Sequence, residues 1–123
     1  MESMLQRFIR YAKINTRSDL HSDAVPTTPG QLDFLHMLEG ELKDLGLSQV
    51  RFNPVDAFVT ALLPSNLPAN QKAPAIGFIA HVDTADFNAE NIQPQVHADY
   101  DGQDIVLNPD LGIVLRVSAF PNL

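Results

Sequence analysis

The chain has 123 residues, of which 45% are apolar and 19% charged, and its formal net charge is -7. This length suits one domain with a core, and this composition is typical of a folded protein. The acidic balance argues against nucleic acid or an anionic membrane surface as a partner, because both need a basic face. The chain has no cysteine, so any transition metal must be held by His, Asp or Glu.

The first residues, MESMLQRFIR, lack the long apolar core of a signal peptide. No stretch of the sequence approaches the roughly 18 apolar residues of a membrane span. We therefore expect a cytoplasmic location.

Two amphipathic helices are predicted in the first part of the chain. Residues 2–13 place apolar side chains at helical spacing, which predicts a short helix packed on a core through Leu5, Phe8, Ile9 and Ala12. The polar residues 15–27 predict a loop.

The second helix is predicted over residues 29–45. Thr28 and Pro29 suit the N-cap and the first helical position, and Gly46 suits the cap at the other end. The predicted buried stripe of this helix consists of leucines, namely Leu32, Leu35, Leu38, Leu42 and Leu45.

Strands are predicted in the rest of the chain, which indicates an α/β or α+β layered domain. The apolar run PAIGFIA, residues 74–80, suits a central strand covered on both faces, since it is too short for a buried helix and contains Gly77. We expect both helices to cover this sheet. Other strand-like pieces are residues 49–53, 57–63, 95–97, 104–107 and 113–117, of which 57–63 and 104–107 are the expected neighbours of the central strand.

The chemically interesting segment is His81-Val82-Asp83, directly after the apolar run. Ligands of open α/β sheets gather beyond the carboxyl ends of the strands. In an extended chain the side chains of His81 and Asp83 point to one face, so the histidine can bind a metal while the aspartate fixes its ring. The alternative is a strand-end histidine that only forms a hydrogen bond with a nearby aspartate.

The other candidates are weaker. His21 lies in a polar loop, and His36 lies on the predicted second helix beside an apolar residue. His97 and Asp99 repeat the His-x-Asp spacing without an apolar run in front. The acidic residues 99–104 lack the glycine and the closing glutamate of a calcium loop, so we expect a solvated turn.

Beyond this spacing, the run GFIAHVDTADFNAENIQPQV, residues 77–96, resembles the first metal-binding segment of the peptidase T family. The segments RFIRYAKINTRSD, VPTTPGQ, YDGQDIVLN and VSAFPNL are also similar to that family, so the resemblance covers essentially the whole chain. Peptidase T enzymes are tripeptide aminopeptidases of the di-zinc exopeptidase clan.

The resemblance implies a fold, a cofactor and two site residues. Residues 1–123 are expected to form the N-terminal part of a zinc-exopeptidase catalytic domain of the phosphorylase/hydrolase type, with a mixed sheet and helices packed on it. His81 corresponds to a zinc ligand, and Asp83 corresponds to a catalytic aspartate that contacts it. The family binds two zinc ions per complete site and uses further ligands, a general base and a lid and dimerisation domain, all expected beyond residue 123.

We therefore expect a fragment of a zinc aminopeptidase that removes the N-terminal residue from tripeptides. By itself this fragment should bind zinc weakly and be inactive, and it should self-associate or pair with the missing C-terminal part. Two alternatives remain open. The first is a fragment of another di-zinc clan member, namely a dipeptidase, carboxypeptidase or amidohydrolase. The second is a non-catalytic structural or binding module.

Overall fold

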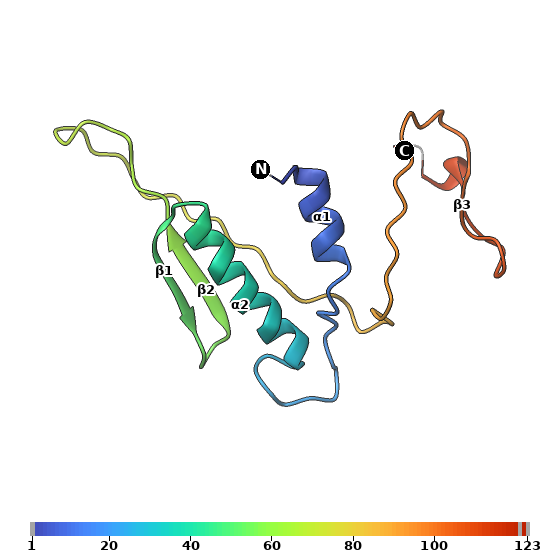
Figure 1. The fold of residues 1–123 in the computed structure, drawn as a ribbon, viewed down its shortest axis with the longest axis horizontal. Helices are drawn as coiled ribbons and strands as arrows, with labels where there is room; N and C mark the ends of the chain where they lie inside the picture. Colours follow the sequence, from blue (N-terminus) through green and yellow to red (C-terminus); the bar gives the residue numbers. More distant parts are fainter. Residues whose placement is uncertain (1, 121, 123) are drawn as a thin grey trace.

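The computed structural model describes residues 2–120 and 122; Met1, and Pro121 and Leu123 of the VSAFPNL segment, lie outside the described residues. The structure is a small mixture of helices and strands (Figure 1), in agreement with a fragment of an α/β protein. No helix in the described part is long and apolar enough to cross a membrane. In chain order the elements are α1 (Met4–Ala12), α2 (Pro29–Asp44), β1 (Ser48–Asn53), β2 (Phe58–Leu62), β3 (Ile105–Asn108), β4 (Ile113–Leu115) and the 3-10 helix η1 (Val117–Ala119).

Helix α1 forms where the apolar spacing predicts it, and its first turn is closed by its own side chains. The Ser3 hydroxyl accepts a hydrogen bond from the Gln6 amide at 3.2 Å, and the Gln6 side chain accepts one from the Ser3 amide at 2.9 Å. This reciprocal pair is a capping box, which satisfies two amides that the helix leaves free. No residue of α1 is buried, so the expectation that its apolar face packs on a core was wrong.

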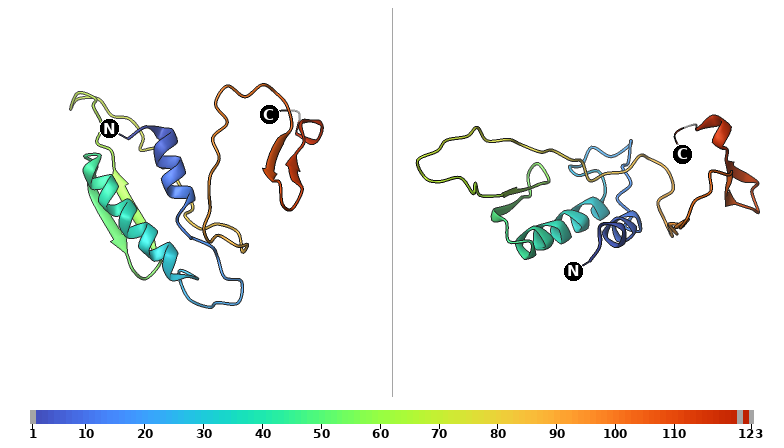
Figure 2. Two further views of the ribbon diagram at one scale, coloured as in Figure 1. Left: turned by 45° about the vertical axis from the view of Figure 1, so that its right-hand side comes forward. Right: turned by 90° about the horizontal axis from the view of Figure 1, so that it is seen from above.

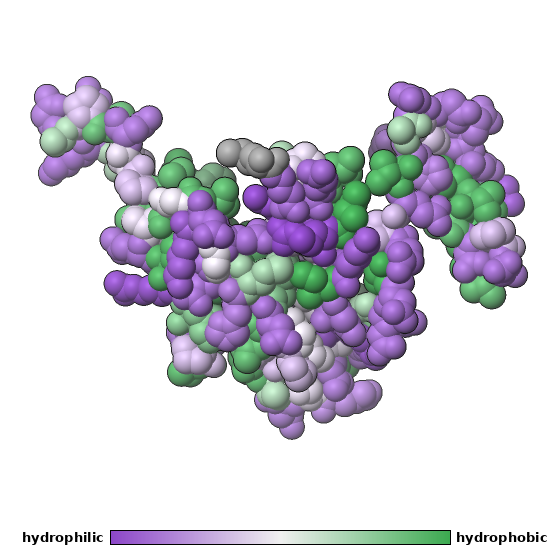
Figure 3. Space-filling model, viewed as in Figure 1, coloured by the Kyte–Doolittle hydropathy of each residue, from purple (hydrophilic) through white to green (hydrophobic). Residues whose placement is uncertain are grey.

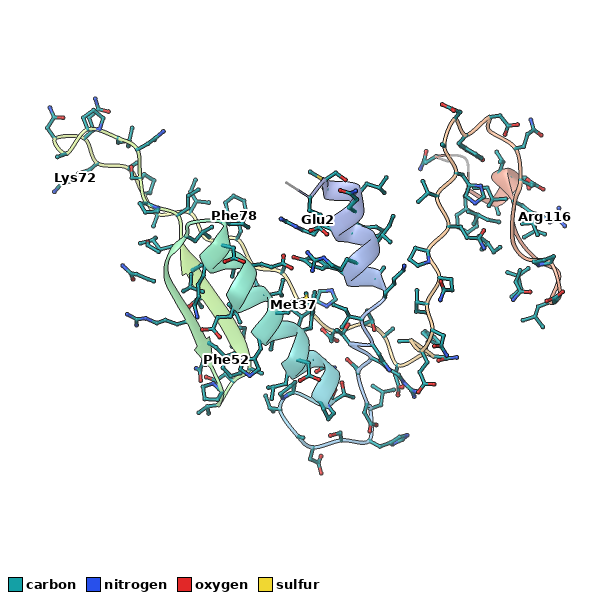
Figure 4. The ribbon with its side chains drawn as sticks, in the orientation of Figure 1. Glu2, Met37, Phe52, Lys72, Phe78 and Arg116 are labelled. Carbon is teal, nitrogen blue, oxygen red and sulfur yellow. The ribbon has the colours of Figure 1, made fainter. Side chains whose placement is uncertain are left out.

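Polar and aromatic side chains connect α1 to α2. The Arg10 guanidinium lies 2.6 Å from a carboxylate oxygen of Glu41, and the Tyr11 hydroxyl donates a hydrogen bond to the same carboxylate. The Tyr11 ring meets Phe34 edge-to-face, with 5.0 Å between the ring centroids. Arg10 also lies 3.4 Å from the Met37 sulfur, on the side of α2 that faces α1 (Figure 4).

Helix α2 confirms the predicted second helix, with Pro29 at its start and Gly46 after its end in a left-handed conformation, φ +80°. Its buried side differs in part from the predicted leucine stripe. Leu35 is buried as expected, but Leu45 is exposed because it lies beyond the helix as its C-cap. The other buried residues of α2 are Phe34 and Gln31, which the apolar pattern did not select.

Strands β1 and β2 form an antiparallel hairpin, which confirms the predicted strands 49–53 and 57–63. Phe52 is opposite Val59 in the register, and α2 contacts both strands. The His36 ring lies 4.3 Å from the Phe52 ring, centroid to centroid, so this histidine belongs to the helix–sheet contact. Sheet and helix together make the layered part of the fold.

The predicted central strand, residues 74–80, is the main correction. These residues run as an unpaired extended segment between the loop after β2 and the turn near residue 86, and they join neither sheet (Figures 1 and 2). Phe78 and Ile79 are each 95% exposed. A strand covered on both faces needs two neighbouring strands and two covering layers, and the described residues supply none of these to the segment.

The C-terminal elements form a second, separate antiparallel hairpin of β3 and β4, in which Val106 is opposite Val114. It stands away from α2, β1 and β2 in every view (Figures 1 and 2). The predicted pieces 104–107 and 113–117 are confirmed approximately, whereas residues 95–97 form no strand. The mixed sheet expected from the resemblance is therefore replaced, within residues 2–120 and 122, by two two-stranded antiparallel sheets. On the face seen in Figure 3, apolar and polar residues are mixed, both around α2 and around the C-terminal hairpin.

Candidate functional site

His81 and Asp83 lie in direct contact, directly after the apolar segment. The Nδ1 atom of His81 is 2.9 Å from Oδ1 of Asp83. An ionised carboxylate only accepts hydrogen bonds, so in the neutral imidazole Nδ1 carries the proton and Nε2 keeps a free lone pair. The His81 side chain is 83% exposed, which leaves Nε2 accessible to a ligand from solution.

The second oxygen of Asp83 has a partner that the sequence analysis missed. The Ser18 hydroxyl donates a hydrogen bond of 2.7 Å to Oδ2. The hydrogen bond from Ser18, followed by that from His81, holds the pKa of Asp83 below its ordinary value. Asp83 therefore links Ser18 to His81 through one hydrogen bond on each of its carboxylate oxygens.

Two backbone hydrogen bonds hold the segment that carries Ser18 beside the segment that carries Asp83. Arg17 and Thr84 form an isolated parallel bridge. The Ser18 amide donates to the Thr84 carbonyl at 2.9 Å, and the Thr84 amide donates to the Thr16 carbonyl at 3.1 Å. The Arg17 guanidinium also forms an ion pair with Asp86, two residues further on.

The first turn of α2 holds residues 16–18 from the other side. Gln31 is only 4% exposed. Its side-chain amide donates hydrogen bonds to the carbonyl of Thr16, at 3.3 Å, and to that of Arg17, at 3.1 Å. The Thr28 hydroxyl donates to the same Arg17 carbonyl at 2.8 Å instead of capping α2, whose N-cap has no side-chain hydrogen bond. The TRSD and VPTTPGQ segments thus meet at this point.

The other histidines lie elsewhere. His21 lies in the loop before α2, where its backbone amide donates to Asp19 at 2.8 Å, and His36 packs on Phe52. His97 is exposed in the extended segment before β3, and Asp99 follows in a left-handed turn, φ +55°. The structure therefore brings neither His21, His36 nor His97 to the pair formed by His81 and Asp83.

A cavity of about 660 Å³ adjoins this pair. His81, Asp83 and Ser18 lie on its polar edge, and the remainder of its wall is mainly apolar side chains of α2 and the β2 region, including Phe34, Leu35, Leu38, Leu42, Phe58 and Val59. An apolar cavity beside a few convergent polar groups is typical of a small-molecule site.

The donor chemistry of the pair fits a zinc ligand with its supporting carboxylate. Metal-bound histidines commonly donate their other ring nitrogen to a carboxylate, which is the arrangement of His81 and Asp83. Across residues 2–120 and 122, no three His, Cys, Asp or Glu side chains gather closely enough to hold a metal ion. The described residues therefore offer zinc one histidine nitrogen and its oriented ring.

Comparison with known proteins gives a consistent result. No family model matches the chain. It is 54% identical over 121 residues to a peptidase T of Fusobacterium nucleatum subsp. nucleatum, which covers 98% of this chain and 29% of the relative. It is 48% identical over 123 residues to a peptidase T of Listeria monocytogenes, covering 99% of this chain and 29% of the relative.

A peptidase T of Limosilactobacillus fermentum is 48% identical over 120 residues, which is 98% of this chain and 29% of the relative. The predicted resemblance to peptidase T is therefore confirmed over nearly the whole chain. The chain spans 29% of the length of these curated relatives and matches an N-terminal part of them.

Proposed function

We propose that residues 1–123 are the N-terminal part of the catalytic domain of a peptidase T-like zinc aminopeptidase that removes the N-terminal residue from tripeptides. In this proposal His81 ligates one of two zinc ions, and Asp83 orients the His81 ring and assists catalysis. The domain is of the zinc-exopeptidase type, and residues after 123 would complete its metal site. A cytoplasmic location is part of the proposal.

Two findings taken together carry the proposal: the chain is 54% identical to a peptidase T over 121 residues, and the side chains of His81 and Asp83 are in contact. The identity alone would fit any part of a peptidase, and the contact alone would fit a hydrogen-bonded surface histidine. Together they favour a metal-binding role, since the contact leaves Nε2 of His81 free for a ligand.

The chemistry assigned to this chain is binding and orientation. Asp83 fixes the tautomer and direction of His81, which raises the basicity of Nε2. The adjoining cavity offers apolar walls against which a peptide side chain can pack. A bound zinc supplies Lewis-acid chemistry to the peptide carbonyl. Catalysis also needs a general base, which we assign to residues outside this chain.

The test uses the protein as its source makes it, after an intact-mass measurement that establishes its length. Zinc per chain is measured by atomic absorption, and hydrolysis of an unblocked tripeptide is measured alongside. We expect His81→Ala to lower the zinc content and to reduce activity by more than about 100-fold, and Asp83→Ala to reduce it by about 10–100-fold.

The matched control is His97→Ala, because His97 and Asp99 repeat the spacing outside the site. This variant should keep both zinc and activity. Unchanged zinc and turnover in His81→Ala would overturn the proposal. Hydrolysis of dipeptides, acyl-amino acids or C-terminal residues instead of tripeptides would assign the protein to another enzyme of the clan. If the intact mass shows a protein longer than 123 residues, the absence of both zinc and activity would identify a structural or binding module.

A further inference from the structure

Each carboxylate oxygen of Asp83 has its own hydrogen-bond partner. Oδ1 lies 2.9 Å from the His81 ring nitrogen and Oδ2 accepts the Ser18 hydroxyl at 2.7 Å. The terminal torsion of an aspartate is soft, so one hydrogen bond leaves the carboxylate free to turn about it. Two hydrogen bonds on opposite oxygens fix its plane, and that plane sets the direction of the His81 ring.

Ser18 is itself held firmly enough to serve as this second partner. Its amide donates to the Thr84 carbonyl, one residue after Asp83, so its hydroxyl is held in register with the carboxylate. Thr16, two residues before Ser18, is 3% exposed, and the buried Gln31 side chain of α2 donates a hydrogen bond to its carbonyl. Hydrogen bonds from α2 to the two residues before Ser18 thus help to fix its position, and α2 itself packs on β1 and β2.

Such a tie matters because no strand pairing within the described residues holds the segment before the site. Residues 74–80 join no sheet, and His81 follows them directly. In the described part of the chain, residues 83–86 are tied to the loop before α2 by hydrogen bonds with residues 16–20, which include the ion pair of Arg17 with Asp86. Among these residues, Ser18 is the one whose side chain reaches Asp83.

We propose that Ser18 is a positioning residue of the metal site: its hydroxyl holds Asp83 so that His81 keeps its proton on Nδ1 and presents Nε2 to the metal. This inference rests on the proposed function of His81. Its contribution passes through Asp83, so Ser18 touches neither metal nor substrate. The inference also gives a role to the TRSD and VPTTPGQ segments, which lie far from His81 in sequence: the first carries Ser18, and the second carries Gln31, which helps to hold it.

The experiment compares Ser18→Ala and Ser18→Cys with Ser18→Thr in the protein as its source makes it. Cysteine keeps the approximate size of serine but donates weakly, whereas threonine keeps the hydroxyl. Ser22→Ala is the matched control, because the Ser22 hydroxyl lies in the same loop and accepts only from the Ala24 amide among the hydrogen bonds of the described residues.

Two measurements are made on each variant. The first is the His81 tautomer in metal-free protein, from ring ¹⁵N–¹H correlation spectra at about pH 8.5, where an ordinary imidazole is neutral. The second is the zinc affinity, from competition with a chelator. We expect wild type, Ser18→Thr and Ser22→Ala to hold the proton on Nδ1. Ser18→Ala and Ser18→Cys should mix the two tautomers and lose about 10–100-fold in zinc affinity.

Each outcome decides the inference. A single Nδ1–H tautomer with unchanged zinc affinity in Ser18→Ala or Ser18→Cys overturns it, as does equal damage in Ser18→Thr and Ser18→Cys. If Ser18→Ala fails to fold, the comparison of threonine with cysteine still decides. Zinc binding that survives His81→Ala would refute the proposed function itself, whereas zinc lost in His81→Ala but kept in Ser18→Ala refutes only the role of Ser18.

Discussion

Gly30 shows how closely the first turn of α2 approaches the segment that supports the site. A Cβ atom built on Gly30 would lie 2.0 Å from the backbone oxygen of Asn15. A backbone oxygen cannot turn away as a flexible side chain can, so residues 15–18 would have to shift. Because Thr16 and Ser18 lie in that segment, a single methyl group at residue 30 affects the site indirectly.

We therefore expect Gly30→Ala to destabilise the protein by about 1–3 kcal/mol, the usual cost of overpacking. The free energy of unfolding from urea titration checks this. Gly40→Ala is the control, since it lies in the same helix with nothing within 4 Å of the added Cβ. That variant should gain about 0.5–1 kcal/mol from helix propensity. Equal stability of the two variants would show that the close approach at Asn15 is absent.

At the level of elements, the contact between α1 and α2 depends on the protonation of Glu41. Burial alone raises the pKa of Glu41, but the hydrogen bonds from Arg10 and Tyr11 outweigh it and hold the pKa below 4.5. Burial, followed by the hydrogen bond to Glu41, raises the pKa of Tyr11 above 10.0. Both shifts favour the same state, a carboxylate bound to a neutral phenol and a guanidinium.

The signs define a pH window. A carboxyl group with a lowered pKa stabilises the fold above its ordinary value of 4.5, and this contribution is lost as pH falls through the folded value. A phenol with a raised pKa contributes below its ordinary value of 10.0, and this contribution is lost as pH rises through the folded value. The contact is therefore strongest between these two values.

We expect Glu41→Gln to reduce stability by about 1 kcal/mol at neutral pH and to flatten the acid side of the stability profile. Circular dichroism during urea titration at several pH values measures both effects. Glu39→Gln is the control and should leave stability nearly unchanged, because Glu39 pairs within its own helix with Lys43. An unchanged acid limb in Glu41→Gln would mean that other carboxylates control it.

Local elements were predictable from sequence, and contacts between distant segments were not. The two helices and the hairpin of β1 and β2 depend on residues close in sequence, so spacing and caps sufficed. The run 74–80 has the composition of a buried strand, but its state depends on strands that must come from elsewhere. The contact of His81 with Asp83 followed from period-two spacing. The hydrogen bond of Ser18 to Asp83 joins residues 65 apart in sequence, and the only sign of it in the sequence was that Ser18 lies in a segment similar to the family.

At the level of the whole molecule, stability should be unevenly distributed. Helix α2 and the first hairpin support each other, whereas β3 and β4 have only each other as extensive contacts among the described elements. An isolated two-stranded hairpin is marginally stable in water. The C-terminal hairpin should therefore open locally while α2, β1 and β2 stay folded.

Hydrogen exchange followed by mass spectrometry tests this directly on residues 1–123. We expect peptides from α2 and β1 to be protected at least about tenfold more than peptides covering residues 105–115, as local opening implies. Exchange in a denaturant provides the unprotected reference for each peptide. Equal protection of the two hairpins would show that they fold as one cooperative unit.

The exposed run 74–80 has a consequence for how the protein is made. Ribosomes add about 5–20 residues per second, so an apolar segment stays unshielded until its pairing partners have emerged. None of the described residues up to 120, nor residue 122, pairs with this run. Phe78 and Ile79 therefore stay exposed after every described residue has been synthesised, and exposed apolar surface of this kind makes a newly made chain prone to aggregation.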